Sequence, residues 1–150
     1  MICIAIVSRI VPHPPNFTPI TAIALFSSIN FKNKLYKYII PITGLIISDI
    51  IIGISLINIF VYLSFILIAF IGAKFKKINN YSILLSSTSF FVISNFGVWL
   101  IGYPKNIEGF ILCYYMALPF FINTILGDIF YCYAMKYSLV YAINKKIIFR

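Results

Sequence analysis

Long apolar stretches alternate with short polar or basic segments along the whole chain. Stretches of this length predict membrane-spanning helices, because about 20 apolar residues cross the hydrocarbon core. As a helix the first stretch is about 16 Å long, half of that core. It is either a half-span or a span whose first turns precede Met1. We expect helices at residues 1–11, 20–31, 38–55, 56–73, 81–101 and 110–143.

The last stretch, residues 110–143, is too long for one straight span. At about 1.5 Å per residue it would extend roughly 50 Å, whereas the hydrocarbon core is about 30 Å thick. Pro119 lies inside it and lacks the backbone donor that a helix interior requires. We therefore expect a short surface helix before Pro119 and a true span from about Phe120 onward.

Composition indicates a membrane protein. The chain has 150 residues, of which 62% are hydrophobic and 10% are charged, and its mean hydropathy is +1.02. A soluble domain of this length has no interior large enough for so many apolar side chains. The sequence therefore predicts an all-α polytopic membrane protein of about six transmembrane helices. Residues 1–150 would form a single integral membrane domain in the lipid bilayer.

The basic residues indicate how the chain is oriented. The formal net charge is +9, from 12 Lys and Arg against 3 Asp and Glu. In a soluble protein this excess could suggest nucleic acid binding, but here the basic residues lie in short loops between apolar spans, which is typical of cytoplasmic loops. The basic clusters alternate with the remaining turns as six spans with both termini in the cytoplasm require. The clusters lie at 32–37, 74–77 and 145–150, and the turns expected outside lie at 12–19, 55–58 and 102–109.

The stretch from Arg9 to Pro19 holds four of the seven prolines and the single histidine. Proline lacks a backbone donor and pushes its predecessor toward extended geometry, so this stretch cannot be helix interior. Non-helical backbone at membrane depth must face water or line a cavity. We interpret residues 12–19 as the lid or mouth of a binding site. His13 has no second His and no Cys near it in sequence, which favours a loop hydrogen bond over a metal ligand.

Strongly polar residues inside membrane spans are costly, so their depth is informative. In the predicted orientation nearly all of them fall in the outer half of the membrane, and four segments and one rigid loop supply them. Because the inner half offers no comparable polar path, the pattern predicts a closed pocket open to the outside. The residues expected to bind a substrate there are Arg9, His13, Asn16, Asp49, Asn95, Trp99, Asn123 and Asp128.

Several of these residues also have ordinary structural interpretations. Arg9 and Asp49 could pair simply to neutralise each other between helices, and Asp128 could bond a neighbouring helix. Trp99 lies at the depth where aromatic rings anchor membrane proteins. Asn95 could hold two helices together through its amide. The convergence of all of them at one depth favours the pocket.

The sequence contains no catalytic constellation that we recognise. There is no Gly-rich phosphate loop, no HExxH motif and no GxSxG motif. The three cysteines, Cys3, Cys113 and Cys132, form no CxxC pair, and we interpret them as small buried apolar residues. We therefore expect no enzyme activity, no cofactor and no metal site.

Five motifs carry a resemblance to known proteins. They are Arg-Ile-Val-Pro-His-Pro-Pro-Asn-Phe-Thr-Pro-Ile at 9–20, Ser-Asp at 48–49, Asn-Phe-Gly-Val-Trp at 95–99, Tyr-Pro at 103–104, and the run from Glu-Gly-Phe to Leu-Gly-Asp at 108–128. Together they resemble a bacterial family of unknown function whose members are described as candidate transport proteins. That family is similar in turn, more loosely, to the substrate-binding S components of energy-coupling factor (ECF) vitamin transporters.

The resemblance implies a six-helix fold in the bacterial cytoplasmic (inner) membrane. It implies an outward-facing pocket capped by the first loop and by the turn between the third and fourth segments. It also implies that the first helices dock onto a membrane scaffold subunit driven by two ATPases. In S components small residues on the first helix make that contact, and the candidates here are Ala5 and Ser8.

We therefore expect a membrane subunit that binds a vitamin-like or cofactor-like small molecule for uptake and performs no chemistry. Arg9 would suit an anionic group, Asp49 or Asp128 a cationic or hydroxyl group, and Trp99 a flat ring. Two alternatives stay open. One is a stand-alone ion- or proton-coupled permease that uses Asp49 and Asp128, and the other is a non-transport membrane protein that helps to assemble a partner.

Overall fold

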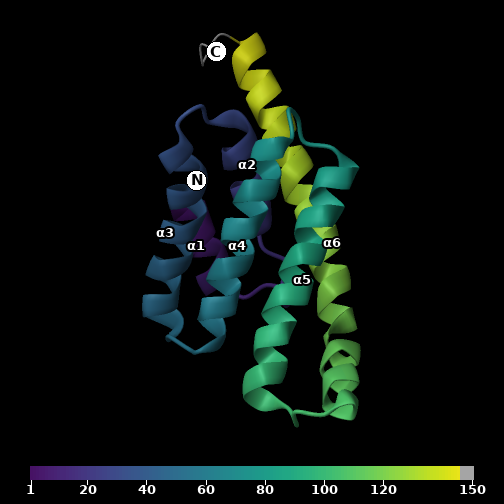
Figure 1. Cartoon of the computed structure of the whole chain (residues 1–150). Coiled ribbons are helices and arrows are strands. Elements are labelled where there is room, and N and C mark those ends of the chain that lie inside the picture. The colour runs from purple at the N-terminus through teal and green to yellow at the C-terminus, as the bar shows by residue number, and fades with distance from the viewer. Residues whose placement is uncertain (146–150) are drawn as a thin grey trace.

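The computed structural model of the chain describes residues 1–145, apart from the side chain of Lys34. This part of the chain is all-α, as the sequence predicted, and contains six helices (Figure 1). Lys146 and Arg150, which belong to the predicted C-terminal basic cluster, lie outside the described residues. The helices are α1 (Ile2–Ile10), α2 (Ile20–Asn30), α3 (Lys34–Ile52), α4 (Ile57–Lys74), α5 (Asn80–Gly102) and α6 (Ile107–Asn144).

Four of these helices, α3 to α6, are long and apolar enough to cross a membrane. The chain is therefore a multi-pass membrane protein by length and composition, with extensive apolar surface available to lipid. Helices α1 and α2 have 9 and 11 residues. Neither of them alone covers a hydrocarbon core about 30 Å thick.

Asparagine side chains set the starts of three long helices. The side chains of Asn33, Asn79 and Asn106 accept hydrogen bonds from backbone N–H groups in the first turns of α3, α5 and α6. Such caps satisfy donors that have no partner within the helix. The cap at Asn33 places Lys34 and Lys37 within the first turns of α3, so this helix begins earlier than the predicted residue 38.

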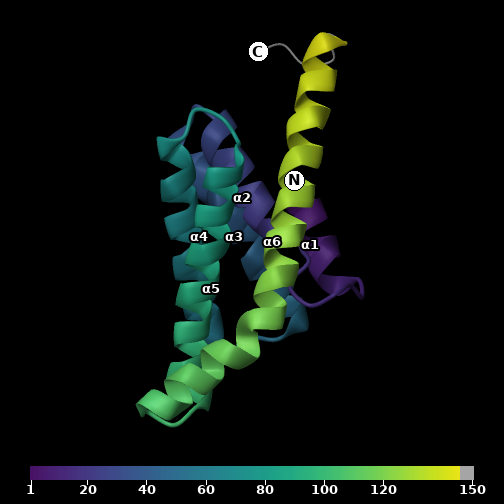
Figure 2. The ribbon, with the colours of Figure 1, turned by 90° about the vertical axis from the view of Figure 1, so that its right-hand side faces the viewer.

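The predicted break at Pro119 is wrong. Helix α6 runs continuously over 38 residues with Pro119 inside it, and Figure 2 shows that it bends instead of ending. A proline removes one backbone hydrogen bond and displaces the preceding turn, which kinks a helix without always terminating it. The kink lets the first half of α6 follow α5, where Tyr114 donates to the carbonyl of Val92 at 2.7 Å. The second half turns back to pack on α2.

Helix α2 forms the centre of the bundle. It contacts α3, α4, α5 and α6, and every residue from Ile20 to Leu25 is buried. Because neighbours surround it, this helix needs no polar face. A methyl group added to Gly72 of α4 would collide with Ser28 of α2. Small residues thus bring these helices close together, as is common in membrane bundles.

Helix α1 lies along α3 and packs on it through small residues. Ala5 is fully buried, and a Cβ atom on Gly44 would lie 2.8 Å from the Cβ atom of Ala5. Ser8 donates its hydroxyl proton to the carbonyl of Ala5 in its own helix. The expectation that Ala5 is available to a partner subunit is therefore wrong, because α3 already covers it. The exposed side chains of α1 are apolar and include Ile4 and Val7.

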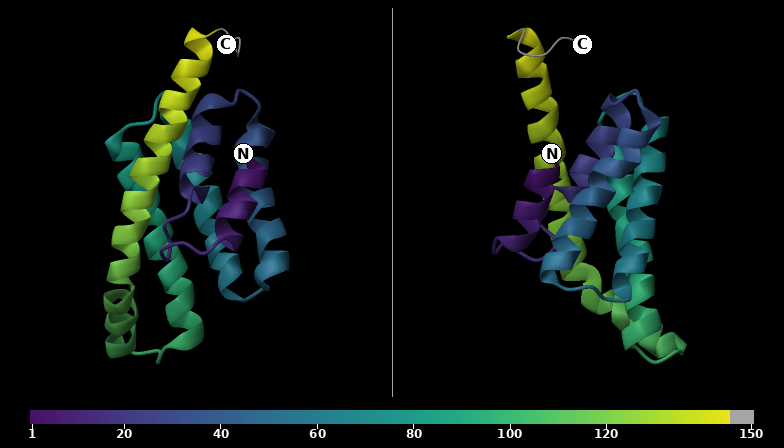
Figure 3. Two further views of the ribbon diagram at one scale, coloured as in Figure 1. Left: turned by 180° about the vertical axis from the view of Figure 1, so that it is seen from behind. Right: turned by 90° about the vertical axis from the view of Figure 1, so that its left-hand side faces the viewer.

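The loops beside the lysine clusters and the remaining turns lie at opposite ends of the bundle. The loops from α2 to α3 and from α4 to α5, which adjoin the lysine clusters, lie at one end together with the C-terminal part of α6 (Figure 1). The α3–α4 and α5–α6 turns lie at the other end. The loop of residues 12–19 is set back from those two turns, beside α6 (Figures 1 and 3).

Candidate functional site

A cavity of about 280 Å³ opens beside the loop of residues 12–19. Its lining comes from α1, from the loop and from all five other helices, so it lies where the whole bundle converges. Half of the lining is polar: Arg9, His13, Asn16, Thr18, Thr21 and Thr124. The other half is apolar: Ile20, Leu45, Ile52, Val61, Phe65 and Phe90.

The loop over the cavity has a defined conformation. The backbone N–H of Phe17 donates to the carbonyl of Pro14 at 3.0 Å, and Asn16 has a φ of 63°. Asparagine is one of the few residues that accept this left-handed region. A hydrogen bond of 2.7 Å joins Nδ1 of His13 to the carbonyl of Val11. Because a carbonyl only accepts, Nδ1 holds the proton, and in the neutral ring Nε2 is an acceptor.

The loop is anchored on α6. The amide of Asn123 donates to the carbonyl of Pro15 at 3.1 Å. One turn further along, Gly127 lets the loop approach, since a Cβ atom there would lie 3.2 Å from the Cα atom of Phe17. The ring of Phe17 packs on Tyr131 with centroids 5.6 Å apart. Asn123 therefore positions the loop and does not line the cavity.

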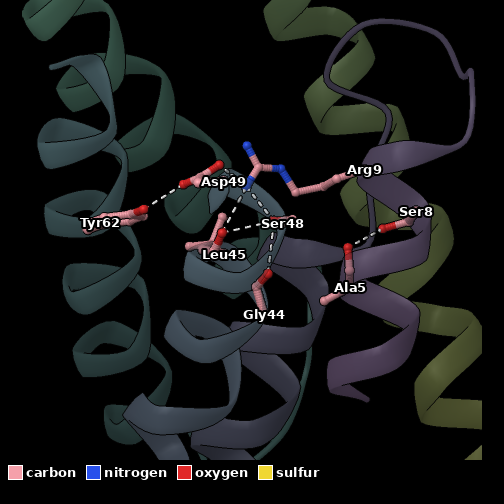
Figure 4. Close-up of polar contacts among 8 residues, drawn as sticks. All are labelled: Ala5, Ser8, Arg9, Gly44, Leu45, Ser48, Asp49 and Tyr62. Carbon is pink, nitrogen blue, oxygen red and sulfur yellow. Dashed lines mark hydrogen bonds and ion pairs between the residues drawn. The ribbon is translucent and has the colours of Figure 1, made fainter. Parts of the chain in front are cut away.

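Arg9 projects from the end of α1 toward α3. Its Nη1 atom lies 2.5 Å from Oδ1 of Asp49 and donates to the hydroxyl of Ser48 at 2.7 Å (Figure 4). It also reaches the carbonyl of Leu45 at 3.3 Å. The Ser48 hydroxyl donates in turn to a backbone carbonyl of its own helix, at Gly44 or Leu45. The ion pair that the sequence offered as an alternative interpretation is therefore present.

The second carboxylate oxygen of Asp49 also has a hydrogen-bond partner within the protein. Oδ2 accepts a hydrogen bond of 2.6 Å from the hydroxyl of Tyr62 on α4. Only 2% of the Asp49 side chain is exposed, against 23% for Arg9. Asp49 is thus occupied by protein groups and does not line the cavity. In Figure 4 no dashed line joins the other terminal nitrogen of Arg9 to the residues drawn, so the guanidinium keeps donors that can face a ligand.

Asp128 lies behind the floor of the cavity. Only 1% of it is exposed, and a hydrogen bond of 2.6 Å joins its Oδ2 atom to Oγ of Ser87 on α5. Thr21 of α2 is within hydrogen-bonding reach of the same carboxylate. Thr21 and Thr124, one turn before Asp128, both line the cavity. Thr21 therefore links the wall of the cavity to Asp128, which does not itself line the cavity.

Two further predicted site residues lie away from the cavity. Asn95 donates to the carbonyl of Phe91 within α5 at 2.8 Å. Trp99 donates its Nε1 proton to the carbonyl of Pro104 at 3.0 Å, and Nζ of Lys105 lies 5.9 Å from its ring centroid. Trp99 therefore stabilises the α5–α6 turn. Of the eight predicted residues, the structure brings Arg9, His13 and Asn16 together on the cavity wall.

Comparison with known proteins identifies the family to which the chain belongs. A family model described as a family of unknown function (DUF6580) matches residues 1–147. The chain belongs to this family. No curated protein and no solved structure matches it. Membership in a family of unknown function agrees with the resemblance in the sequence, whereas the likeness to S components rests on the motifs alone.

The sequence analysis missed nine of the twelve residues that line the cavity. Thr18, Thr21 and Thr124 had a detectable signal, because hydroxyl residues lie close to the proline-rich loop and to Asp128 in the sequence. Phe65 and Phe90 carried no such signal, since aromatic residues are common throughout this chain. Their place on the cavity wall depends on how α4 and α5 are rotated in the bundle.

The cysteines are only partly as expected. Cys113 and Cys132 are buried, as predicted, whereas Cys3 is exposed on α1. All three are free thiols. Within residues 1–145, no group of three or more His, Cys, Asp and Glu side chains could hold a metal ion.

Proposed function

We propose that this protein is the substrate-binding membrane subunit of an uptake transporter for a small vitamin-like or cofactor-like molecule. The observation that supports this function most is the cavity beneath the loop of residues 12–19. Ligand pockets combine a mostly apolar wall with a few fixed polar groups. Here the apolar wall meets Arg9, His13, Asn16 and three threonines.

The cavity suggests the character of the ligand. Its volume of about 280 Å³ lies just below the usual range for ligand pockets, roughly 300–1,000 Å³, so the ligand would be small. The unused guanidinium donors of Arg9 suit an anionic group. Phe65 and Phe90, with ring centroids 5.5 Å apart and planes tilted by 52°, offer the aromatic contacts to a flat ring that the sequence analysis expected from Trp99.

We further propose that the bundle crosses the bacterial cytoplasmic membrane in the manner of an S component, with six segments and a cytoplasmic C-terminus. The lysine-bearing loops at one end would face the cytoplasm under the positive-inside rule. The cavity mouth would then open toward the outside. A scaffold subunit with two ATPases, if it docks on α1, must use exposed residues such as Ile4 and Val7 because Ala5 is covered.

Native mass spectrometry tests the binding function. The protein would be purified in mild detergent from its native membrane and compared with the double variant Arg9→Ala/Asp49→Ala, which removes the guanidinium without leaving a buried unpaired charge. We expect a stoichiometric small molecule on the wild type and its loss from the double variant. Lys105→Ala in the distant turn is the matched control and should retain the ligand. A ligand-free wild type, or equal retention by the double variant, would refute this site.

One observation favours a second candidate, the proton-coupled permease. Asp49 is held by Arg9 and Tyr62, whereas the contacts of Asp128 among residues 1–145 are with the uncharged Ser87 and Thr21, so this carboxyl could carry a proton. Uptake of the retained molecule into liposomes that contain this chain and no ATPase would establish the permease. Retention without such uptake would support the binding subunit. A chain that never binds a small molecule, but whose loss disrupts a partner complex, would indicate the assembly function.

A further inference from the structure

Asp128 is as deeply buried as Asp49, and it has the simpler environment of the two. It projects from α6 toward Ser87 of α5 and Thr21 of α2. The ion pair found within residues 1–145 joins Arg9 to Asp49 and does not include Asp128. An ionised carboxylate buried without a cation loses its hydration and receives no compensating charge, so the ionised form is strongly disfavoured.

The hydrogen bonds of Ser87 accommodate a proton on Asp128. Oγ of Ser87 lies 3.0 Å from the carbonyl of Ile83 and 2.6 Å from Oδ2 of Asp128. A serine hydroxyl has one proton, so it cannot donate to both oxygens at once. If Asp128 is a carboxylic acid, its O–H donates to Ser87, and Ser87 donates to Ile83. All three groups are then satisfied without any buried net charge.

The surroundings of Asp128 contain few other titratable groups. Helices α2 and α5 present the hydroxyls of Thr21 and Ser87. On α6 itself, Cys132 lies one turn further along and is buried. The backbone of the loop approaches the helix at Gly127, directly before Asp128, through the apolar residue Phe17. None of these groups carries a positive charge that could hold Asp128 in its ionised form.

We propose that Asp128 is a proton-binding site in the membrane interior, protonated at neutral pH and supplied with protons through the adjacent cavity. Thr21 lines that cavity and lies within hydrogen-bonding reach of the carboxyl group, so its hydroxyl would link the two. The ligand of this site is the proton itself. The assignment therefore stands or falls separately from the proposed binding of a small molecule.

Infrared spectroscopy of the reconstituted protein tests the assignment directly. The chain contains only three carboxyl side chains, Asp49, Glu108 and Asp128, so the carbonyl band of a protonated acid can be assigned by substitution. We expect this band in the wild type near neutral pH, its loss in Asp128→Asn, and its retention in Glu108→Gln. Absence of the band from the wild type, or its persistence in a folded Asp128→Asn variant, would overturn the proposal.

Two further measurements protect the test against a variant that fails to fold. Ser87→Ala keeps the carboxyl group but removes its acceptor, so the band should remain and shift to higher frequency. Transfer of the wild type into D₂O should shift the band as the acid proton exchanges, and Thr21→Val should slow that exchange at least several-fold. Unchanged band frequency in Ser87→Ala, or unchanged exchange in Thr21→Val, would contradict the hydrogen bond or the proton path respectively.

Discussion

The guanidinium of Arg9 and the carboxylate of Asp49 form an ion pair of 2.5 Å that joins α1 to α3. Tyr62 extends the pair to α4 by donating to the second carboxylate oxygen. One buried carboxylate thus fixes three helices at the edge of the cavity, and it fixes the orientation of the arginine that faces the cavity. The pair is both the structural bridge and the support for the proposed ligand-binding donor.

Replacing Arg9 alone should destabilise the protein more than replacing both members of the pair. Arg9→Met leaves Asp49 buried without its cation, and we expect a loss of about 3–5 kcal/mol in the free energy of unfolding. The double variant Arg9→Met/Asp49→Leu should recover most of this loss. Chemical denaturation in detergent measures both values, and strictly additive effects would show that the two residues are not coupled.

Two substitutions at Asn16 should separate the shape of the loop from its chemistry. Asn16→Val forces a β-branched residue to a φ of 63°, which costs about 1–2 kcal/mol. Asn16→Gly accepts this backbone and removes the side chain from the cavity. We expect faster proteolysis of the loop in the valine variant, and weaker ligand retention with normal proteolysis in the glycine variant. Equal proteolysis of both variants would contradict the left-handed conformation.

Leucine at Gly127 should lift the loop from α6. A Cβ atom there already lies 3.2 Å from the backbone of Phe17, so a larger side chain cannot fit without displacing the loop. In a Cys3→Ser background, maleimide labelling of Asn16→Cys should accelerate when Gly127→Leu is added. Gly102→Leu is the control, because nothing lies within 4 Å of a Cβ atom at that position. Similar acceleration by both leucines would refute a specific contact.

Trp99→Phe should weaken the α5–α6 turn and leave the cavity intact. The change removes the indole donor to the carbonyl of Pro104 while keeping an aromatic ring against Phe110. We expect a loss of about 1 kcal/mol in the free energy of unfolding, with ligand retention unchanged in native mass spectrometry. Loss of the ligand would return Trp99 to the binding site.

A protonated Asp128 should make the protein less stable as the pH rises. The folded state then binds one proton that the unfolded state has already lost near neutral pH, so folding becomes less favourable by up to about 1.4 kcal/mol per pH unit. Asp128→Asn should abolish this slope. Denaturation measured at a series of pH values checks it, and an identical slope in both proteins would exclude Asp128 as its source.

The sequence could predict the long helices because their cause is local. Apolar runs of roughly membrane length, as in α4 and α5, do not depend on distant residues, and neither does the asparagine cap at the start of α5. Pro119 shows the limit of local reasoning. Whether a proline ends a helix or only bends it depends on packing, and here α5 and α2 support the two halves of α6 on either side of the kink.

The sequence could predict site residues only where they lie close together along the chain. Arg9, His13 and Asn16 adjoin the proline-rich loop, so the sequence alone could associate them with one mouth. Asn95 and Trp99 lie at the predicted membrane depth of that mouth. Depth alone, however, does not determine which side of the helix bundle a side chain faces. The structure directs Asn95 to its own helix and Trp99 to the α5–α6 turn.

By itself, the sequence determined the all-α membrane character, the long spans and the polar loop that interrupts them, because hydrophobicity and proline chemistry act locally. Only the tertiary structure decided which carboxylate receives a cation. Arg9 reaches Asp49 because α1 packs on α3 through Ala5 and Gly44. Asp128 faces α2 and α5, which offer it hydroxyls alone. Two residues of the same type thus acquire different roles, since charge compensation in a low-dielectric interior depends on the side chains within a few ångströms.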